Sequence, residues 1–143
     1  MHEIKILLVE DNDGDIVLTL EALYDARLKN EVQVIKDGAA AISFLSQAAK
    51  EDLPDLILLD INLPKIDGKE VLHYIKGSSS LKRIPVVMLT TSSSQTDILD
   101  SYNGHANCYI TKPVDLNKFF DLVKLIEDFW ITIVKLPGKE SYG

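Results

Sequence analysis

The chain alternates between short runs of apolar residues and longer segments in which apolar residues recur at helical spacing. The first run, Ile4–Val9, shows little alternation, which is typical of a strand buried on both faces of a sheet. The pattern predicts five strands, at residues 4–9, 31–36, 55–60, 86–90 and 107–111. The second strand alternates apolar and polar residues, so we expect it at an edge of the sheet.

The segments between the strands predict helices. After the first strand, Ile16, Leu20 and Leu23, joined by Leu18, form a helical stripe, and Asp13 is its expected N-cap. The remaining predicted helices cover residues 39–49, a segment capped by Asp67, residues 96–103, and a long segment from about residue 116 to residue 134.

Regular alternation of strands and helices favours an α/β fold with a parallel sheet. Right-handed crossovers and short connections leave few arrangements of such a chain. We therefore expect a doubly wound five-stranded parallel sheet of flavodoxin-like order 2-1-3-4-5, with helices on both faces. Residues 1–136 are predicted to form one domain that ends in the long helix, and residues 137–143 a flexible tail.

Composition narrows the functions that such a domain can have. The chain has 143 residues with 15 Lys and Arg against 22 Asp and Glu, a formal net charge of −7, which argues against nucleic-acid binding. Its one cysteine cannot form an internal disulfide, and no secretory leader precedes the first strand, so the chain is expected to be cytoplasmic. No apolar run approaches the roughly 18 residues of a membrane span.

Polar side chains stand where the predicted strands end. Glu10 and Asp11 follow the first strand, Asp60 ends the third, Thr90 ends the fourth, and Lys112 follows the fifth. In open α/β sheets ligands bind beyond the carboxyl ends of the strands, so we expect these groups in one crevice. Clustered carboxylates favour a cation, and hard oxygen ligands suit Mg²⁺. The lysine and the hydroxyl suit the oxygens of a phosphoryl group.

Each of these residues also has a purely structural interpretation. Asp11 or Asn12 could cap the following helix, Asp60 could belong to a turn, and Thr90 could be an ordinary β-branched strand residue. Lys112 could be a solvated lysine. The coincidence of complementary groups at four strand ends favours the functional interpretation.

At these positions the sequence resembles the receiver domain of two-component response regulators, over essentially the whole chain. The resemblance implies a signalling protein, not an enzyme, in which Asp60 accepts a phosphoryl group from a histidine kinase as an acyl phosphate. It implies that Mg²⁺ is held by Glu10, Asp11, Asp60 and the backbone carbonyl of Asn62. Slow self-catalysed phosphorylation and dephosphorylation are expected.

The resemblance also implies roles for residues after the fourth and fifth strands. Thr90 and Lys112 would contact the phosphoryl oxygens. Thr91 would lie at the entrance to the phosphorylation site, at a position where many receivers carry a smaller residue. Tyr109 stands at the aromatic switch position, so we expect a phosphoryl group to draw Thr90 inward and Tyr109 to follow. We expect a cis peptide bond at Pro113, because Lys112 must turn back over the pocket.

A narrower resemblance concerns the partner. Residues 62–65, 89–92, 105–113 and 126–130 are similar to single-domain regulators paired with phytochrome-type histidine kinases. Such a regulator would signal by binding an effector or by passing its phosphate onward.

Two alternative functions share parts of this pattern. A magnesium-dependent aspartyl phosphatase would usually carry its nucleophile in an Asp-x-Asp motif after the first strand. Here Asp11 is followed by Asn12 and Asp13, and a chain of 143 residues leaves no room for the cap domain of such an enzyme. A degenerate receiver would keep the fold as an interaction module without being phosphorylated. A flavin or dinucleotide carrier is disfavoured because the first turn is acidic and lacks a glycine-rich phosphate loop.

The long C-terminal helix predicts a homodimer. Its apolar residues form two neighbouring stripes, and one amphipathic face covers little more than about 100°. We expect the second stripe and its aromatic neighbour to form a symmetric interface, through Leu122, Leu125, Phe129 and Trp130. The alternative is that these residues fold back onto their own domain.

Overall fold

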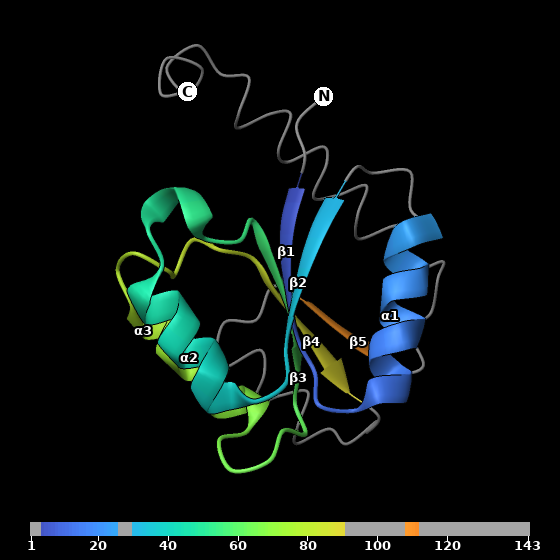
Figure 1. Ribbon diagram of the computed structural model, residues 1–143. Helices are drawn as coiled ribbons and strands as arrows, with labels where there is room; N and C mark the ends of the chain where they lie inside the picture. Colours follow the sequence, from blue (N-terminus) through green and yellow to red (C-terminus); the bar gives the residue numbers. More distant parts are fainter. Residues whose placement is uncertain (1–3, 26–29, 91–107, 112–143) are drawn as a thin grey trace.

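The computed structural model describes residues 4–25, 30–90 and 108–111. Within this part of the chain five parallel strands form one sheet in the order β2-β1-β3-β4-β5, which confirms the predicted order (Figure 1). The strands are β1 (Ile4–Val9), β2 (Asn30–Ile35), β3 (Leu56–Asp60), β4 (Val86–Thr90) and β5 (Cys108–Thr111). Strand β2 lies at one edge of the sheet, as its alternating pattern indicated.

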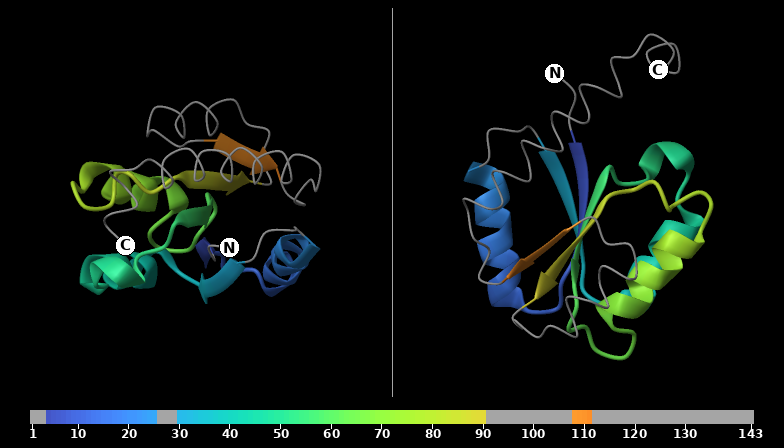
Figure 2. Two further views of the ribbon diagram at one scale, coloured as in Figure 1. Left: turned by 90° about the horizontal axis from the view of Figure 1, so that it is seen from above. Right: turned by 180° about the vertical axis from the view of Figure 1, so that it is seen from behind.

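Helices cover both faces of the sheet, as predicted. Helix α1 (Asp13–Asp25) lies on one face, and α2 (Gly38–Gln47) and α3 (Gly68–Gly77) lie together on the other (Figure 2). The sequence predicts a helix over residues 39–49, and α2 begins one residue earlier and ends two residues earlier. A short 3-10 helix, η1 (Lys50–Asp52), follows it. The predicted helices over residues 96–103 and 116–134 lie outside the described residues, as does the predicted tail over residues 137–143.

Strands β1 and β3 have apolar side chains on both faces because both faces are covered by helices. Leu7 and Val9 pack toward α2 and α3, whereas Ile6 and Leu8 pack toward α1. All five residues of β3 are buried, including Asp60 at its end. The two central strands therefore fix the position of the residues that follow them.

The start of α1 differs from the prediction. The Asn12 side chain accepts a hydrogen bond from the Asp15 backbone N–H at 2.9 Å, so Asn12 caps the helix and Asp13 is its first residue. Leu18, which we expected in the buried stripe, is 48% exposed. Ile16 and Leu23 are buried as predicted. In the described residues, no helix has both the length and the apolar composition to cross a membrane.

Candidate functional site: an acidic pocket at the carboxyl ends of the strands

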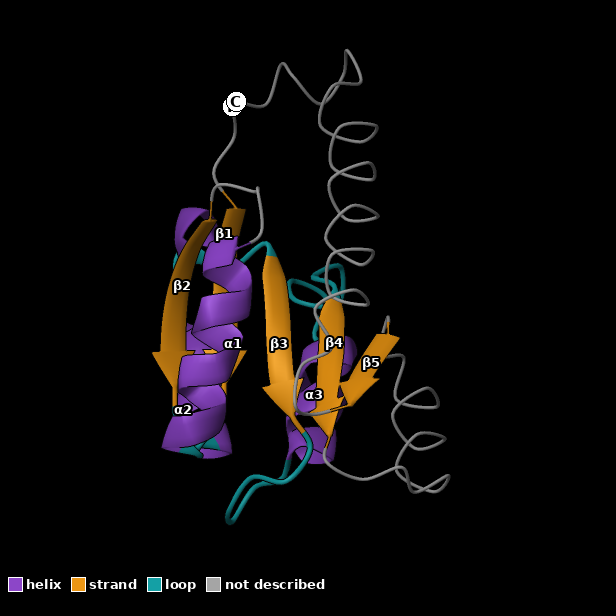
Figure 3. Cartoon of the chain, turned by 90° about the vertical axis from the view of Figure 1, so that its right-hand side faces the viewer, coloured by secondary structure: helices purple, strands orange, loops and turns teal. Residues whose placement is uncertain are grey.

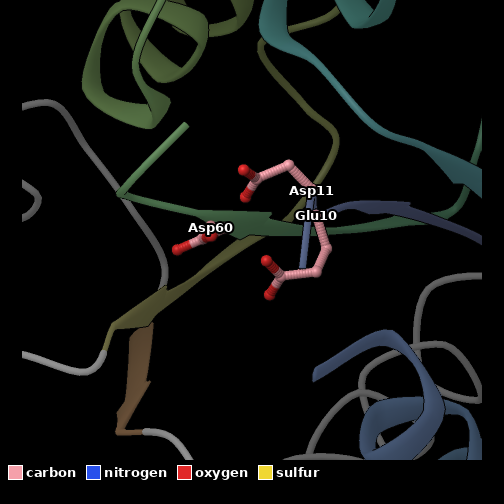
Figure 4. A group of neighbouring side chains, drawn as sticks. All are labelled: Glu10, Asp11 and Asp60. Atoms are coloured by element: carbon pink, nitrogen blue, oxygen red, sulfur yellow. The ribbon is translucent and has the colours of Figure 1, made fainter. Parts of the chain in front are cut away.

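Three carboxylates meet beyond the carboxyl ends of β1 and β3. Strands β1 and β3 run parallel to each other (Figure 3). Val9 of β1 is paired with Leu59 of β3, so Glu10, which follows β1, and Asp60, the last residue of β3, lie at the same level. Asp11 comes next in the chain. One carboxylate oxygen from each of Glu10, Asp11 and Asp60 lies within 4.8 Å of the others (Figure 4). These are the three carboxylates of the crevice that the strand ends predicted.

The three side chains differ in exposure. Glu10 is 0% exposed and Asp60 is 2% exposed, whereas Asp11 is open to solvent. The Asn12 backbone N–H donates to Glu10 Oε2 at 3.3 Å, and the Asn62 backbone N–H donates to Asp60 Oδ1 at 3.0 Å. Two buried carboxylates beside a third repel each other, and a cation bound between them would relieve this repulsion.

The donor set fits a small, hard divalent cation. Mg²⁺ takes oxygen ligands at about 2.1 Å, so two ligand atoms on opposite sides of one ion lie roughly 4.2 Å apart. A third ligand lies roughly 3.0 Å from at least one of these two atoms. The three carboxylate oxygens, which lie within 4.8 Å of one another, would therefore draw closer together around one bound ion. Mg²⁺ also keeps several water ligands, which suits a pocket open to solvent at Asp11.

The segment after Asp60 is held tightly against the sheet. The Ile61 N–H donates to the Leu89 carbonyl at 2.9 Å, and the Gly68 N–H donates to the Ile61 carbonyl at 2.9 Å. Asn62, whose carbonyl we expect to bind the metal, therefore lies in a short loop fixed at both ends. Asp67 caps α3 by accepting from the Glu70 N–H at 3.0 Å, as predicted.

Gly68 packs against the backbone of Asp60, a contact that the sequence analysis missed. A Cβ atom on Gly68 would lie 2.1 Å from the backbone oxygen of Asp60, so only glycine fits between α3 and the end of β3. On the other side of the loop, a Cβ on Gly38 would lie 2.5 Å from the Ile66 carbonyl oxygen. A signal was available at Gly68, because glycine is a weak helix former and stands directly after a capping aspartate.

The other predicted site residues lie on or beyond β4 and β5. Thr90 is paired with Thr111, and Asp60 is paired with Leu89, which places the ends of β3, β4 and β5 beside one another. Tyr109 is paired with Met88 in the same ladder. Lys112 directly follows Thr111 in the chain. Thr91, Lys112, Pro113, Leu122, Leu125, Phe129 and Trp130 lie outside the described residues.

A doubly wound parallel sheet with an acidic pocket at its carboxyl edge defines the class of this protein. Residues 6–124 match the family model of the response regulator receiver domain, and the chain belongs to this family of signalling proteins. It is 48% identical over 136 residues to the response regulator Rcp1 of Synechocystis sp., covering 93% of this chain and 92% of Rcp1.

Two solved structures extend this comparison. The structure of the phosphorylated cyanobacterial phytochrome response regulator RcpA is 50% identical, with a TM-score of 0.76, and the match covers 95% of this chain and 99% of RcpA. The Mn²⁺-bound form of Rcp1 matches at 47% identity with a TM-score of 0.73, covering 94% of this chain and 99% of Rcp1. The chain is thus a receiver-domain response regulator homologous to regulators of phytochrome systems.

Proposed function

We propose that this protein accepts a phosphoryl group on Asp60 in a Mg²⁺-dependent reaction. The observation that carries the proposal is the convergence of Glu10, Asp11 and Asp60 within 4.8 Å, with Asp60 at the end of a central strand. The solved structure of a phosphorylated relative and the Mn²⁺-bound form of Rcp1 support it. Glu10, Asp11, Asp60 and the Asn62 carbonyl would hold the metal, which supplies positive charge to the transferring phosphoryl oxygens.

The transfer itself is a displacement at phosphorus. An oxygen of Asp60 attacks the phosphorus atom while the bond from phosphorus to the donor nitrogen of a phosphohistidine breaks, and an acyl phosphate forms. The hydrogen bond from the Asn62 N–H to Oδ1 orients the Asp60 carboxylate. Lys112 and Thr90 neutralise and bind the phosphoryl oxygens, with Thr91 at the entrance.

The phosphoryl donor is proposed to be a histidine kinase of the phytochrome type. This proposal is supported by the similarity to RcpA and Rcp1 over nearly the full length of the chain. Phosphorylation would then shift the surface formed around β4 and β5 between two packings, with Thr90 and Tyr109 as the relay. The altered surface would bind an effector or a further phosphotransfer protein.

Labelling with acetyl phosphate tests the proposal. In the presence of Mg²⁺ we expect one phosphoryl group per chain, and loss of labelling in Asp60→Asn. Asp52→Asn, an equivalent change at an exposed aspartate of η1, should label as the wild type does. Labelling of Asp60→Asn to stoichiometry would overturn the assignment.

The same experiment separates the two alternatives. Rapid multiple turnover of the donor would identify a phosphatase, and no labelling of a folded, Mg²⁺-loaded protein would identify an interaction module.

A further inference from the structure

A cavity lies at the opposite end of the sheet from the three carboxylates. It is bounded by the end of α2, by η1, by the end of α3 and by the loop over residues 78–84 that leads into β4. Its volume is about 500 Å³, which is within the range of small-molecule sites. Phosphoryl transfer uses none of the residues that line it.

The floor of this cavity is apolar. Leu45 of α2 and Leu81 of the loop are buried there, and Leu53 and Tyr74 are half-buried beside them. Tyr74 adds an aromatic ring with a polar hydroxyl group. A flat apolar or aromatic group would lose its hydration on this floor, as in most small-molecule sites.

The rim of the cavity is cationic. Lys50 of η1 and Arg83 of the loop line it from two different elements, and both are exposed. Ser46, Ser78, Ser79 and Ser80 add hydroxyl groups, whereas the described residues that line the cavity include no carboxylate. Among the described residues, a lining with two cations and no carboxylate is unusual in a chain with a net charge of −7, and such a lining favours an anionic ligand.

The loop that carries Arg83 is held in place before any ligand binds. Lys76 Nζ donates to the carbonyl of Lys82 at 3.1 Å and to that of Ile84 at 2.8 Å, so the residues on both sides of Arg83 are anchored to α3. The Leu81 and Lys82 N–H groups both donate to the Ser78 carbonyl. A preorganised rim lowers the entropy cost of binding.

We propose that this cavity binds a small anionic molecule with an apolar or aromatic body. The body would lie against Leu45, Leu81 and Tyr74, and its carboxylate, sulfonate or phosphate group would face Arg83 and Lys50. Arginine suits this role because its guanidinium group can form two parallel hydrogen bonds to one anionic group.

Amide chemical shifts measured during titration test this proposal. The probe is naphthalene-1-sulfonate, and the neutral comparison is 1-naphthalenemethanol. We expect saturable shifts in the amides of residues 78–83, and weaker binding of the neutral compound. Arg83→Gln and Lys50→Gln should each weaken binding of the sulfonate by about tenfold, because each removes a charge-assisted contact. Both residues are exposed, so both variants should fold.

Lys82→Gln is the matched control. Lys82 is an exposed cation beside Arg83 that does not line the cavity, so its replacement should change the affinity less than about twofold. Three results would each overturn the proposal: no shift in residues 78–83 at millimolar probe, equal affinity for the neutral compound, or equal loss of affinity in Lys82→Gln and Arg83→Gln.

Discussion

The first residue of α3 touches the backbone of Asp60. Because a Cβ on Gly68 would lie 2.1 Å from the Asp60 carbonyl oxygen, any side chain there must push α3 away from the sheet or displace Asp60. The carbonyl belongs to the proposed phosphoacceptor, so a displacement would also move its carboxylate relative to Glu10 and Asp11. Gly68 therefore connects the packing of a helix to the geometry of the acidic pocket.

We expect Gly68→Ala to destabilise the protein by about 1–3 kcal/mol, the usual cost of overpacking, and to slow labelling by acetyl phosphate. Gly77→Ala makes the same change at the other end of α3, where a Cβ would have no neighbour within 4 Å. That variant should be as stable as the wild type or up to about 1 kcal/mol more stable. Urea unfolding and labelling rates measure both effects. Equal stability of the two variants would contradict this prediction.

At the scale of elements, Lys76 joins the end of α3 to the loop before β4. Its two hydrogen bonds satisfy the carbonyls of Lys82 and Ile84. Lys76→Met keeps an apolar side chain of similar length and removes both bonds, so we expect a loss of about 1–3 kcal/mol in the free energy of unfolding. Lys82→Met, at an exposed neighbouring position, should cost less than about 0.5 kcal/mol. Denaturant titration of both variants provides the measurement.

The stability difference between the wild type and Lys76→Met should also depend on pH. Burial lowers the pKa of Lys76 below its usual value of 10.5. In the window between the two pKa values the unfolded chain holds a proton that the folded chain has lost, so folding stability rises with pH there. The wild type should therefore gain stability relative to Lys76→Met as the pH rises from the lowered pKa of Lys76 toward its usual value of 10.5. A difference that falls over this window would show that the folded state favours the charged amine.

The hydrophobic pattern predicted the elements well, for a physical reason. Strands β1 and β3 are apolar on both sides because helices cover both faces of the sheet, and this leaves a pattern that differs from that of an amphipathic helix. The N-cap of α1 was harder to predict, because Asn12 and Asp13 are both good N-cap residues. Which of them caps the helix depends on where the helical backbone begins. The exposure of Leu18 was not predictable, since a single apolar side chain on a surface is common.

The same contrast applies to the site. The carboxyl ends of parallel strands meet at one edge of the sheet, so the sequence alone was enough to predict that Glu10, Asp11 and Asp60 lie close together. The contact between Gly68 and Asp60 depends on the path of the loop over residues 61–67, and hydrophobic periodicity carries no information about that path.

At the scale of the whole molecule, the predicted C-terminal helix carries two neighbouring apolar stripes, whereas one amphipathic face covers little more than about 100°. We expect Phe129→Ala combined with Trp130→Ala to shift a homodimer toward monomer in sedimentation analysis, because aromatic residues at the centre of an interface commonly contribute about 2 kcal/mol or more. Unfolding should remain cooperative. A wild type that stays monomeric at high micromolar concentration, phosphorylated or not, would rule out this interface.

Metal binding should stabilise the entire fold, because the three carboxylates come together only when β1 and β3 are paired. At a hundredfold excess of Mg²⁺ over its dissociation constant, linkage adds about 2.7 kcal/mol to the free energy of unfolding, which corresponds to a rise in Tm of roughly 5–10 °C. Asp11→Asn removes one of the repelling charges, so we expect a higher Tm without metal and a smaller rise with it. Asp52→Asn should respond to Mg²⁺ as the wild type does, since this exposed residue lies on η1, outside the pocket. Thermal melts in chelator and in millimolar Mg²⁺ measure these shifts, and an unchanged wild-type Tm would argue against a metal site between these carboxylates.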